Sequence, residues 1–503
     1  MSKAHQRRDS LAAQLNWDEL LRLAIRHFGI KRFRPGQQDL IESVLLGKDA
    51  IGILPTGGGK SLCFQLPSIL LKGTTVVVSP LIALMQDQSE KLADLGIEAA
   101  RLDSTLTSSE VEDARDAIAD GAAEIVYVTP ERLENADYLS LLEKSKVTLF
   151  VVDEAHCISQ WGHDFRPAYL NLKSAIHKLG SPPVLALTAT ATDDIAQDII
   201  KQLGLHNPKI VRRGIERPNL KFTVSACLNE QQKKAAILQI LDEHEGSGII
   251  YTATIKAAEL LFNWLREQGI NAGLYHGKMR NKDREEMQQA FMRDDYKVIV
   301  ATKAFGLGID KSNVRFVIHY QFPDSVETYY QEAGRAGRDG LPAQATLLYQ
   351  LEDRRIQTYF LGGKYPTREE CWRVYSQFTD QAESAKEGFS ISDLSQLVGI
   401  AQNKIKVIAC YLESAGVLHK GRRLRKVKDF QSDLELSDFL GTYEQRHASD
   451  RERLEQIQHY AQTINCRVRF LKDYFGEDTT EDCKVLCDNC QTPPSESLNI
   501  GAA

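Results

Sequence analysis

Residues 55–61 read PTGGGKS, a loop whose residue types and spacing suit the binding of phosphate. Successive glycines let backbone amides approach phosphate oxygens, while Lys60 can reach the β and γ phosphates and Ser61 can ligate Mg²⁺. An apolar run before the loop and a helix-like segment after it provide the strand, loop and helix that a phosphate site needs. The alternative is a glycine-rich turn that binds nothing. The predicted nucleotide contacts are Thr56, Gly57, Gly58, Gly59, Lys60 and Ser61.

Two adjacent carboxylates follow another apolar run, in LFVVDEAH at 149–156. Asp153 stands where it can hold Mg²⁺ through water, and Glu154 where it can orient and deprotonate an attacking water. A surface acidic turn is the alternative, and it is a weak one beside PTGGGKS. His156 is either a packed histidine or a residue that couples this site to another. Together the motifs predict nucleotide hydrolysis with Lys60 and Glu154 among the catalytic groups.

A later segment, YYQEAGRAGRDG at 329–340, supplies two arginines three positions apart. On a helix this spacing puts Arg335 and Arg338 on one face, from which both can reach a γ-phosphate as arginine fingers. An exposed helix that carries two arginines is the alternative. Each glycine inside a helix costs about 1 kcal/mol, so glycines here need a reason. We predict that this segment closes on the nucleotide.

Short apolar runs alternate with helix-length segments over residues 50–350, as in parallel sheets covered by helices. The pattern restarts after Arg217, which predicts two α/β domains in tandem with ligands beyond the carboxyl ends of the strands. After about residue 350 the chain becomes mainly helical. The predicted strands are Ile51–Leu54, Thr75–Val78, Ile125–Thr129, Leu149–Asp153, Val184–Thr188, Gly248–Tyr251, Ala272–Tyr275, Lys297–Ala301 and Phe316–His319.

The composition of this chain is that of an ordinary globular protein. Of 503 residues, 62 are Lys or Arg and 68 are Asp or Glu, so the net charge of -6 gives no global attraction to nucleic acid. Any site for a polyanion therefore has to be local. No apolar run reaches the roughly 18 residues of a membrane span, and the first residues lack the apolar stretch of a signal peptide. We expect an intracellular protein without membrane partners, cytoplasmic if bacterial.

Residues 390–428 predict a helix–turn–helix followed by a wing, the pattern of a winged helix. The first helix ends at Gly399, and the second carries an apolar face that includes Ile405 and Ile408. Six Lys or Arg lie between residues 420 and 428, a basic patch that suits contact with a duplex backbone. A solvated surface is the alternative. The predicted DNA contacts are Arg422, Arg423 and Arg425.

Four of the nine cysteines crowd near the end of the chain. Cys466 is followed after sixteen residues by Cys483, then after three by Cys487 and after two by Cys490. In a reducing compartment, four thiolates at this spacing predict a closed tetrahedral Zn²⁺ site. Such a site is structural rather than catalytic, because no ligand position is left for water. An iron–sulfur cluster and free thiols are the alternatives.

The motifs along residues 20–350 resemble those of superfamily-two helicases, and in detail those of the RecQ family of ATP-dependent DNA helicases. The most specific are FGIKRFRPGQQ at 28–38 and DEAHCISQWGHDFRPAY at 153–169. The others follow in the family's order: VVSPLIALMQDQ at 77–88, TPERL at 129–133, LTATA at 187–191 and VATKAFGLGIDK at 300–311. The resemblance implies two RecA-like domains, ATP with Mg²⁺, and a motor that moves 3′ to 5′ on DNA in repair and recombination. It also implies that Arg34 and Gln37 lie near adenine.

The loop at 158–166 crowds aromatic rings and a cation into one segment. This suits stacking of single-stranded bases, worth about 1 to 3 kcal/mol per base, but packing between the domains is an equal alternative by residue type alone. The resemblance favours DNA sensing, because the loop begins soon after Glu154. The predicted coupling residues are His156, Trp161, His163, Phe165 and Arg166.

The predicted fold class is therefore α/β: two tandem RecA-like parallel-sheet domains, followed by a mainly helical region with a winged helix and a zinc-binding module. The predicted division is an ATP-binding domain at 1–215, a second RecA-like domain at 216–350, a helical connector at 351–388, the winged helix at 389–430, the zinc module at 440–495 and a tail at 496–503. The predicted partner is DNA, as single strand and forked duplex. The sequence does not indicate how many chains associate. An RNA helicase and an ATP-switched DNA-binding or annealing protein are the alternatives.

Overall fold

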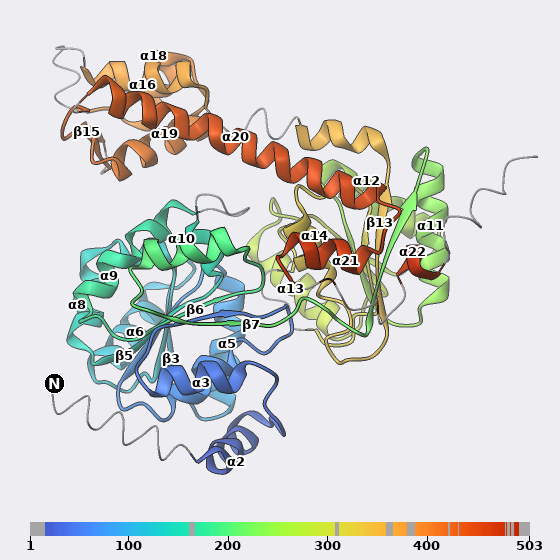
Figure 1. The fold of residues 1–503 in the computed structure, drawn as a ribbon, viewed down its shortest axis with the longest axis horizontal. Coiled ribbons are helices and arrows are strands. Elements are labelled where there is room, and N and C mark those ends of the chain that lie inside the picture. The colour runs from blue at the N-terminus through green and yellow to red at the C-terminus, as the bar shows by residue number, and fades with distance from the viewer. Residues whose placement is uncertain are drawn as a thin grey trace, which may run out of the picture. The chain divides into compact units, whose positions relative to one another are not determined.

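A computed structural model describes most of the chain. The described residues are 16–159, 166–306, 311–358, 366–379, 388–420, 423–430, 432–477, 479, 483 and 487–491. They separate into two units. The first unit holds both large sheets and the residues from Tyr460 onward, and the second unit holds residues 324–326 and 351–459 (Figure 1). The six-part division predicted from the sequence stays a prediction.

The first sheet has seven parallel strands in the order β3-β4-β2-β5-β6-β1-β7. Alternate residues of a strand point to opposite faces: in β5, Phe150 belongs to the apolar core on one face and Val151 to that on the other. Helices therefore cover both faces of the sheet (Figure 1). The strands are β1 Ala50–Ile53, β2 Thr74–Val78, β3 Ala99–Leu102, β4 Ile125–Val128, β5 Val147–Val152, β6 Val184–Thr188 and β7 Lys209–Arg212.

Four of the nine described helices of this half, α2, α6, α8 and α10, begin at a residue whose side chain accepts a hydrogen bond from a backbone N–H of the first turn. Helix α6, for example, begins with a capping box in which Thr107 and Glu110 satisfy each other's backbone N–H. The helices are α2 Trp17–Phe28, α3 Gln37–Leu45, α4 Leu62–Ser68, α5 Ile82–Asp94, α6 Ser108–Ala119, α7 Pro130–Leu133, α8 Ala136–Lys144, α9 Leu172–Lys178 and α10 Asp193–Leu203, with 3₁₀ turns η1 Ala155–Ile158 and η2 Pro167–Asn171.

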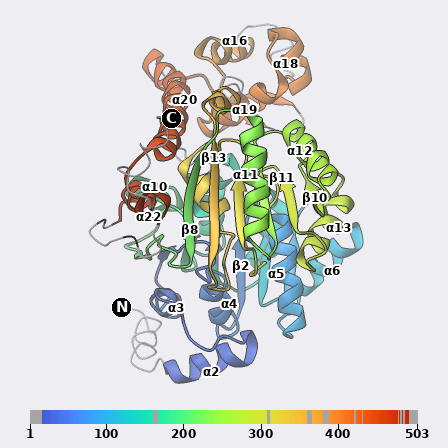
Figure 2. The ribbon, with the colours of Figure 1, turned by 90° about the vertical axis from the view of Figure 1, so that its right-hand side faces the viewer.

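The second sheet has six parallel strands in the order β10-β11-β9-β12-β13-β8, seen beside helices α11 to α13 in Figure 2. The chain reaches it from β7 through the linker at 213–219. The elements are β8 Leu220–Ala226, α11 Glu230–Glu243, β9 Gly248–Tyr251, α12 Ile255–Glu267, β10 Ala272–Tyr275, α13 Asn281–Met292, β11 Val298–Ala301, β12 Phe316–His319, α14 Val326–Ala333 and β13 Ala343–Tyr349.

The remaining described residues are mainly helical. One core in the second unit joins residues from three helices and a two-stranded hairpin, including Phe378, Leu394, Ile408 and Leu424. None of the described helices is long and apolar enough to cross a membrane. The elements are η3 Leu351–Asp353, α16 Arg368–Thr379, α18 Ile391–Val398, α19 Gln402–Ser414, β14 Leu418–Lys420, β15 Leu424–Lys426, α20 Asp433–Gln462, α21 Arg467–Tyr474 and α22 Asp488–Gln491.

The predicted fold class is confirmed for the two parallel sheets and the helical region that follows them. Each predicted strand is present within one or two residues of its predicted ends. Four strands of the two large sheets were not predicted, namely β3, β7, β8 and β13. Three of them, β3, β7 and β8, lie at sheet edges and carry partly exposed polar side chains, such as Arg101 and Lys221. They therefore lack the continuous apolar run that marks a central strand.

Candidate active site

The phosphate loop connects β1 to α4 in a conformation that requires glycine. Gly57 and Gly59 both have φ of 79°, in the left-handed region that other residues avoid. A Cβ on Gly59 would lie 2.4 Å from Nε2 of Gln37, and one on Gly58 would lie 2.8 Å from the Pro55 carbonyl oxygen. The glycines therefore allow the backbone to turn and allow Gln37 and the Pro55 carbonyl to lie close to the loop.

Gln37 lies against the phosphate loop and is 2% exposed. Its Oε1 accepts from the Arg34 backbone N–H at 2.7 Å, and its Nε2 donates to the Gly59 carbonyl at 2.9 Å. The side-chain oxygen keeps one further lone pair and the side-chain nitrogen one further N–H, both of which a ligand could use. Gln37 thus positions the loop, in addition to lining the cavity beside Arg34 as the adenine prediction requires.

The two carboxylates follow β5, at the carboxyl edge of the first sheet. Asp153 Oδ2 accepts from Ser79 Oγ at 3.3 Å. Burial first, and the neighbouring Glu154 carboxylate second, raise the pKa of Asp153 to about 7, although Lys60 opposes the rise. A carboxyl so short of positive charge fits a divalent cation, and Ser61 lines the same cavity. These residues therefore fit Mg²⁺.

Glu154 sits in a left-handed backbone conformation, with φ of 46°. For a residue with a Cβ this conformation costs on the order of 1 kcal/mol or more, and such strain collects at functional sites. Its buried Oε2 accepts no hydrogen bond from the described residues. His156 Nδ1 lies 3.3 Å from this oxygen, and Glu154 lines the same cavity as Asp153.

His156 is buried beside this carboxylate and connects it to the loop after β6. His156 Nδ1 lies 2.9 Å from Thr188 Oγ1, and that hydroxyl donates to the Thr190 carbonyl at 3.0 Å. Because the only hydroxyl proton of Thr188 is thereby used, Nδ1 of His156 must be the donor to Thr188. Thr190 Oγ1 in turn accepts from Gln331 of α14 at 3.4 Å. These hydrogen bonds connect His156 to α14, and they are a physical route for the predicted coupling.

Arg335 and Arg338 both line the cavity that the phosphate loop lines, but neither lies on a helix. Helix α14 ends at Ala333, and both arginines lie in the turns that follow, so the predicted helical face is wrong. After Ala333 the backbone bonds span three residues instead of four, from the Arg335 N–H to the Glu332 carbonyl at 3.2 Å, and Gly337, with φ of 63°, then turns the chain away. Arg335 is 7% exposed, and its Nη1 donates to the Gly306 carbonyl. A three-residue spacing fits a helix and a tight turn equally.

A cavity of about 880 Å³ lies where these elements meet, within the unit that holds both sheets. Ligand pockets are commonly about 300 to 1,000 Å³, so this one has room for a nucleotide. Its lining includes every residue predicted to bind or hydrolyse ATP: Arg34, Gln37, Thr56, Gly57, Gly58, Gly59, Lys60, Ser61, Asp153, Glu154, Arg335 and Arg338.

The predicted aromatic loop is described only at its ends. Trp161, His163 and Phe165 lie outside the described residues. Arg166 is described: its backbone N–H donates to the Cys157 carbonyl at 2.9 Å, and its Nη1 donates to the Pro80 carbonyl at 3.3 Å. The loop therefore leaves and returns beside the first sheet's carboxyl edge, close to Glu154.

The second unit contains the predicted helix pair and hairpin. Ser390 caps α18, Gly399 ends it with φ of 65°, and β14 pairs with β15 in antiparallel register. Arg423 donates from Nε to the Gly388 carbonyl at 2.9 Å and remains 47% exposed. Arg425 is exposed on β15, and Arg422 lies outside the described residues. The winged-helix assignment remains a prediction that this geometry fits.

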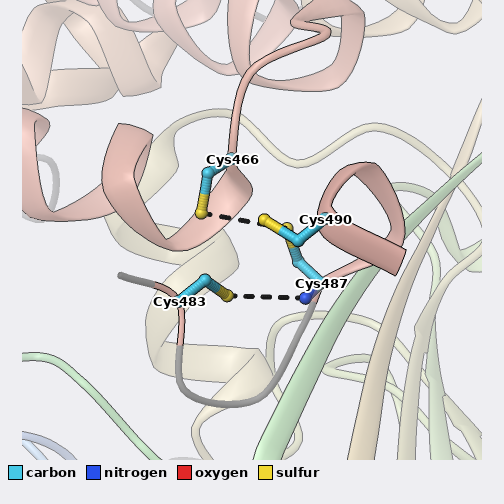
Figure 3. Close-up of side chains that lie close together, drawn as sticks. All are labelled: Cys466, Cys483, Cys487 and Cys490. Carbon is cyan, nitrogen blue, oxygen red and sulfur yellow. Dashed lines mark hydrogen bonds between the residues drawn. The ribbon is translucent and has the colours of Figure 1, made fainter. Parts of the chain in front are cut away.

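Four thiols converge in the first unit (Figure 3). The sulfurs of Cys466, Cys483, Cys487 and Cys490 all lie within 4.8 Å of one another. Cys487 Sγ is 3.9 Å from Cys466 Sγ and 3.5 Å from Cys490 Sγ, too long for disulfides. A tetrahedral zinc with bonds of about 2.3 Å needs sulfur separations of about 3.8 Å, so these residues fit zinc.

Backbone groups support the cysteine cluster. The N–H of Arg467 donates to Cys487 Sγ at 3.3 Å, which stabilises a thiolate. The Arg467 side chain pairs with Asp488 at 3.0 Å, and Asp488 Oδ2 accepts from the Val224 N–H of β8 at 2.9 Å. The cluster is thereby tied to the edge of the second sheet. This ion pair was not predicted, because its partners are 21 residues apart in the sequence.

Three family models match successive segments of the chain, and together they cover most strands of the two sheets and the cysteine cluster. The family model for DEAD/DEAH box helicases matches residues 34–199, that for the helicase conserved C-terminal domain matches 232–340, and that for RecQ zinc-binding matches 424–491. The probable ATP-dependent DNA helicase RecS of Bacillus subtilis is 42% identical over 345 residues, which are 68% of this chain and 69% of that protein. The chain belongs to the RecQ family. The RecQ helicase of the same bacterium is 44% identical over 341 residues, 67% of this chain and 57% of that protein.

The chain thus spans little more than half the length of this RecQ relative. Among solved structures, the helicase MrfA bound to DNA and AMPPNP matches with a TM-score of 0.56 at 20% identity, covering 82% of this chain and 62% of that one. At this identity the likeness shows the fold alone. Membership of the RecQ family implies ATP, Mg²⁺ and zinc. The residues that line the cavity fit ATP and Mg²⁺, and the four cysteines fit zinc.

Two positions of the active site were not identified from the sequence. Thr188 and Thr190 lie in LTATA, a stretch that resembled the family without any chemical role assigned to it. Their position just beyond the carboxyl end of β6 is a usable signal, because ligands of parallel sheets bind at that edge.

Proposed function

We propose that this chain is an ATP-dependent DNA helicase of the RecQ type, which moves 3′ to 5′ along a single strand and unwinds duplex DNA. The observation that carries the proposal is the single cavity lined by the phosphate loop, both carboxylates and both arginines. Nucleotide hydrolysis between two RecA-like halves is a means of moving them in cycles. The polarity comes from the family resemblance.

In this proposal Lys60 and the amides of the glycine loop bind the β and γ phosphates, and Ser61 and Asp153 hold Mg²⁺. The cation supplies neutralisation of phosphate charge. Glu154 orients and deprotonates the attacking water, and its place in the lining of the cavity beside Lys60 and Asp153 supports that role. Arg335 and Arg338 stabilise the charge that develops on the phosphate.

The single strand is proposed to run across both sheets, with Trp161 and Phe165 stacking on bases. The loop that carries these rings begins beside Glu154, so DNA binding can alter the nucleotide site. His156, hydrogen-bonded to Thr188, is proposed to carry that coupling. Closure on ATP and reopening after hydrolysis then become alternating grips on the DNA.

The helical unit is proposed to contact the duplex ahead of the motor. Its exposed Arg423 and Arg425 support contact with phosphates, which supply most of the affinity in such interfaces. The zinc is proposed to be structural, with Cys466, Cys483, Cys487 and Cys490 as its ligands. A forked duplex is therefore the proposed substrate, since it offers both a single strand and a duplex.

The test is an unwinding assay on forked duplexes of DNA and RNA, each with ATP or a non-hydrolysable analogue. We expect unwinding of DNA with ATP only. Unwinding of RNA in preference to DNA would favour an RNA helicase. Strand annealing that the analogue supports as well as ATP would favour an ATP-switched annealing protein and would overturn the proposal.

A further inference from the structure

Arg217, in the linker between the sheets, places its guanidinium among four backbone carbonyls. Nη2 donates to the carbonyls of Ala336 and Gly337, at 3.0 and 2.7 Å. Nη1 is shared between the carbonyls of Gly334 at 3.2 Å and Thr56 at 3.3 Å. Three of these acceptors belong to the turn that carries Arg335 and Arg338, and the fourth belongs to the phosphate loop.

The planar guanidinium suits this arrangement in a way that an ammonium does not. Its donors point in fixed directions, so one side chain can serve acceptors on two sides at once. Burial lowers the pKa of Arg217 from its usual value, but the surrounding carbonyl dipoles favour the cation. The neighbouring Asn219 adds Nδ2 bonds to the carbonyls of Gly337 and Leu341, at 2.7 and 2.8 Å. The linker and the arginine-bearing turn thus form one piece.

The linker is held from its other side by the segment that follows the first zinc cysteine. The Ile215 N–H donates to Glu477 Oε1 at 2.7 Å, and Lys472 Nζ lies 2.9 Å from Glu216 Oε2. The Ile215 carbonyl accepts from Tyr330 Oη of α14 at 2.5 Å. Backbone atoms immediately before Arg217 are therefore fixed between the zinc module and the second sheet.

We propose that Arg217 is a positioning residue that sets the turn of Arg335 and Arg338 against the phosphate loop. This inference rests on the proposed function and adds a regulatory element to the same site. The three bonds to the turn move with the second sheet, and only the bond to Thr56 crosses to the first sheet. Closure on ATP makes that bond and opening breaks it, so Arg217 favours the arrangement in which the arginines reach the phosphate.

The test is Arg217→Lys in the full chain, measured by ATP hydrolysis with saturating single-stranded DNA. We expect kcat to fall roughly ten- to hundredfold, the range for slightly misplaced groups, with KM for ATP and the Kd of a fluorescent ADP within about twofold of wild type. Arg293→Lys is the matched control, because Arg293 pairs with Asp295 on the surface of the second domain. Unchanged kcat in Arg217→Lys, or a loss of nucleotide affinity equal to the loss of kcat/KM, overturns the proposal.

A second variant keeps the test decisive if Arg217→Lys lowers the unfolding temperature. Glu216→Gln with Lys472→Met removes the linker's ion pair without leaving a buried charge unpaired. We expect this double variant to keep one zinc per chain and to lose kcat, by less than Arg217→Lys but in the same direction. Wild-type kcat in a zinc-loaded double variant counts against the linker's role. Failure of the proposed function itself would look different: the wild-type chain would then show no DNA-stimulated hydrolysis. The failure of the Arg217 proposal and that of the proposed function are therefore distinguishable.

Discussion

Gln331 of α14 donates from Nε2 to Oγ1 of Thr190 at 3.4 Å, a bond that joins an element beside the second sheet to the loop after β6 of the first. From Thr190 the hydrogen bonds continue through Thr188 to His156, whose Nδ1 lies 3.3 Å from Glu154 Oε2. The group proposed to activate water is therefore linked to the opposite half of the cleft. A movement of either half alters the surroundings of Glu154.

Glu154→Gln should abolish turnover while ATP still binds. The amide keeps the shape of the side chain and removes its basicity, so we expect kcat to fall by about 100-fold or more. Steady-state hydrolysis with DNA and the binding of a fluorescent ATP analogue measure the two effects. Glu143→Gln, on the exposed face of α8, is the control. Lys60→Ala should instead lose nucleotide affinity itself. Hydrolysis at the wild-type rate by Glu154→Gln would show that the base is another group.

Thr188→Val should weaken the stimulation of hydrolysis by DNA roughly tenfold, with ATP affinity retained. The change preserves volume but removes the acceptor of His156 and the donor to the Thr190 carbonyl. Hydrolysis rates with and without single-stranded DNA measure the stimulation. Thr252→Val is a matched control, since Thr252 makes the same type of bond, from Oγ1 to the Thr254 carbonyl at 3.1 Å, in the second domain. Equal stimulation in both variants would remove the route through His156.

Trp161→Ala and Phe165→Ala should uncouple the motor. Nucleotide affinity should remain near normal while DNA ceases to stimulate hydrolysis, because stacking is lost and the phosphate site is not. DNA-stimulated hydrolysis and nucleotide binding check this, with Trp264→Ala on α12 as the control. Precipitation of both variants would instead support packing of these rings between the domains.

Cys487→Ser should release zinc and destabilise the segment from Cys466 to Cys490. Binding of a structural zinc is folding free energy for so small a module. DNA binding and unwinding should fall, while weak hydrolysis survives because the sheets have their own cores. Elemental analysis should give about one zinc per wild-type chain, and Cys227→Ser should keep it. Iron in place of zinc, or no metal with all cysteines titratable in the native protein, would refute the assignment.

The nucleotide site was largely predictable from the sequence, because each motif directly follows an apolar strand. Asp153 and Glu154 come after Val147–Val152, and the phosphate loop comes after Ala50–Ile53, so local order placed both at one sheet edge. The turn of Arg335 was predicted as a helix because a three-residue spacing does not reveal that α14 ends at Ala333. Contacts such as Arg217 with Thr56 join residues 161 positions apart, and periodicity carries no information at that range.

The most direct test of the account is the unwinding of partial duplex DNA with either a 3′ or a 5′ single-stranded tail, by the wild-type chain and by Glu154→Gln. Release of the displaced strand, followed by fluorescence with ATP and Mg²⁺, reports the motor itself. We predict release from the 3′-tailed duplex by the wild-type chain only, and none without hydrolysis. Equal release by Glu154→Gln, or release from the 5′-tailed duplex alone, would contradict an ATP-driven motor of RecQ type.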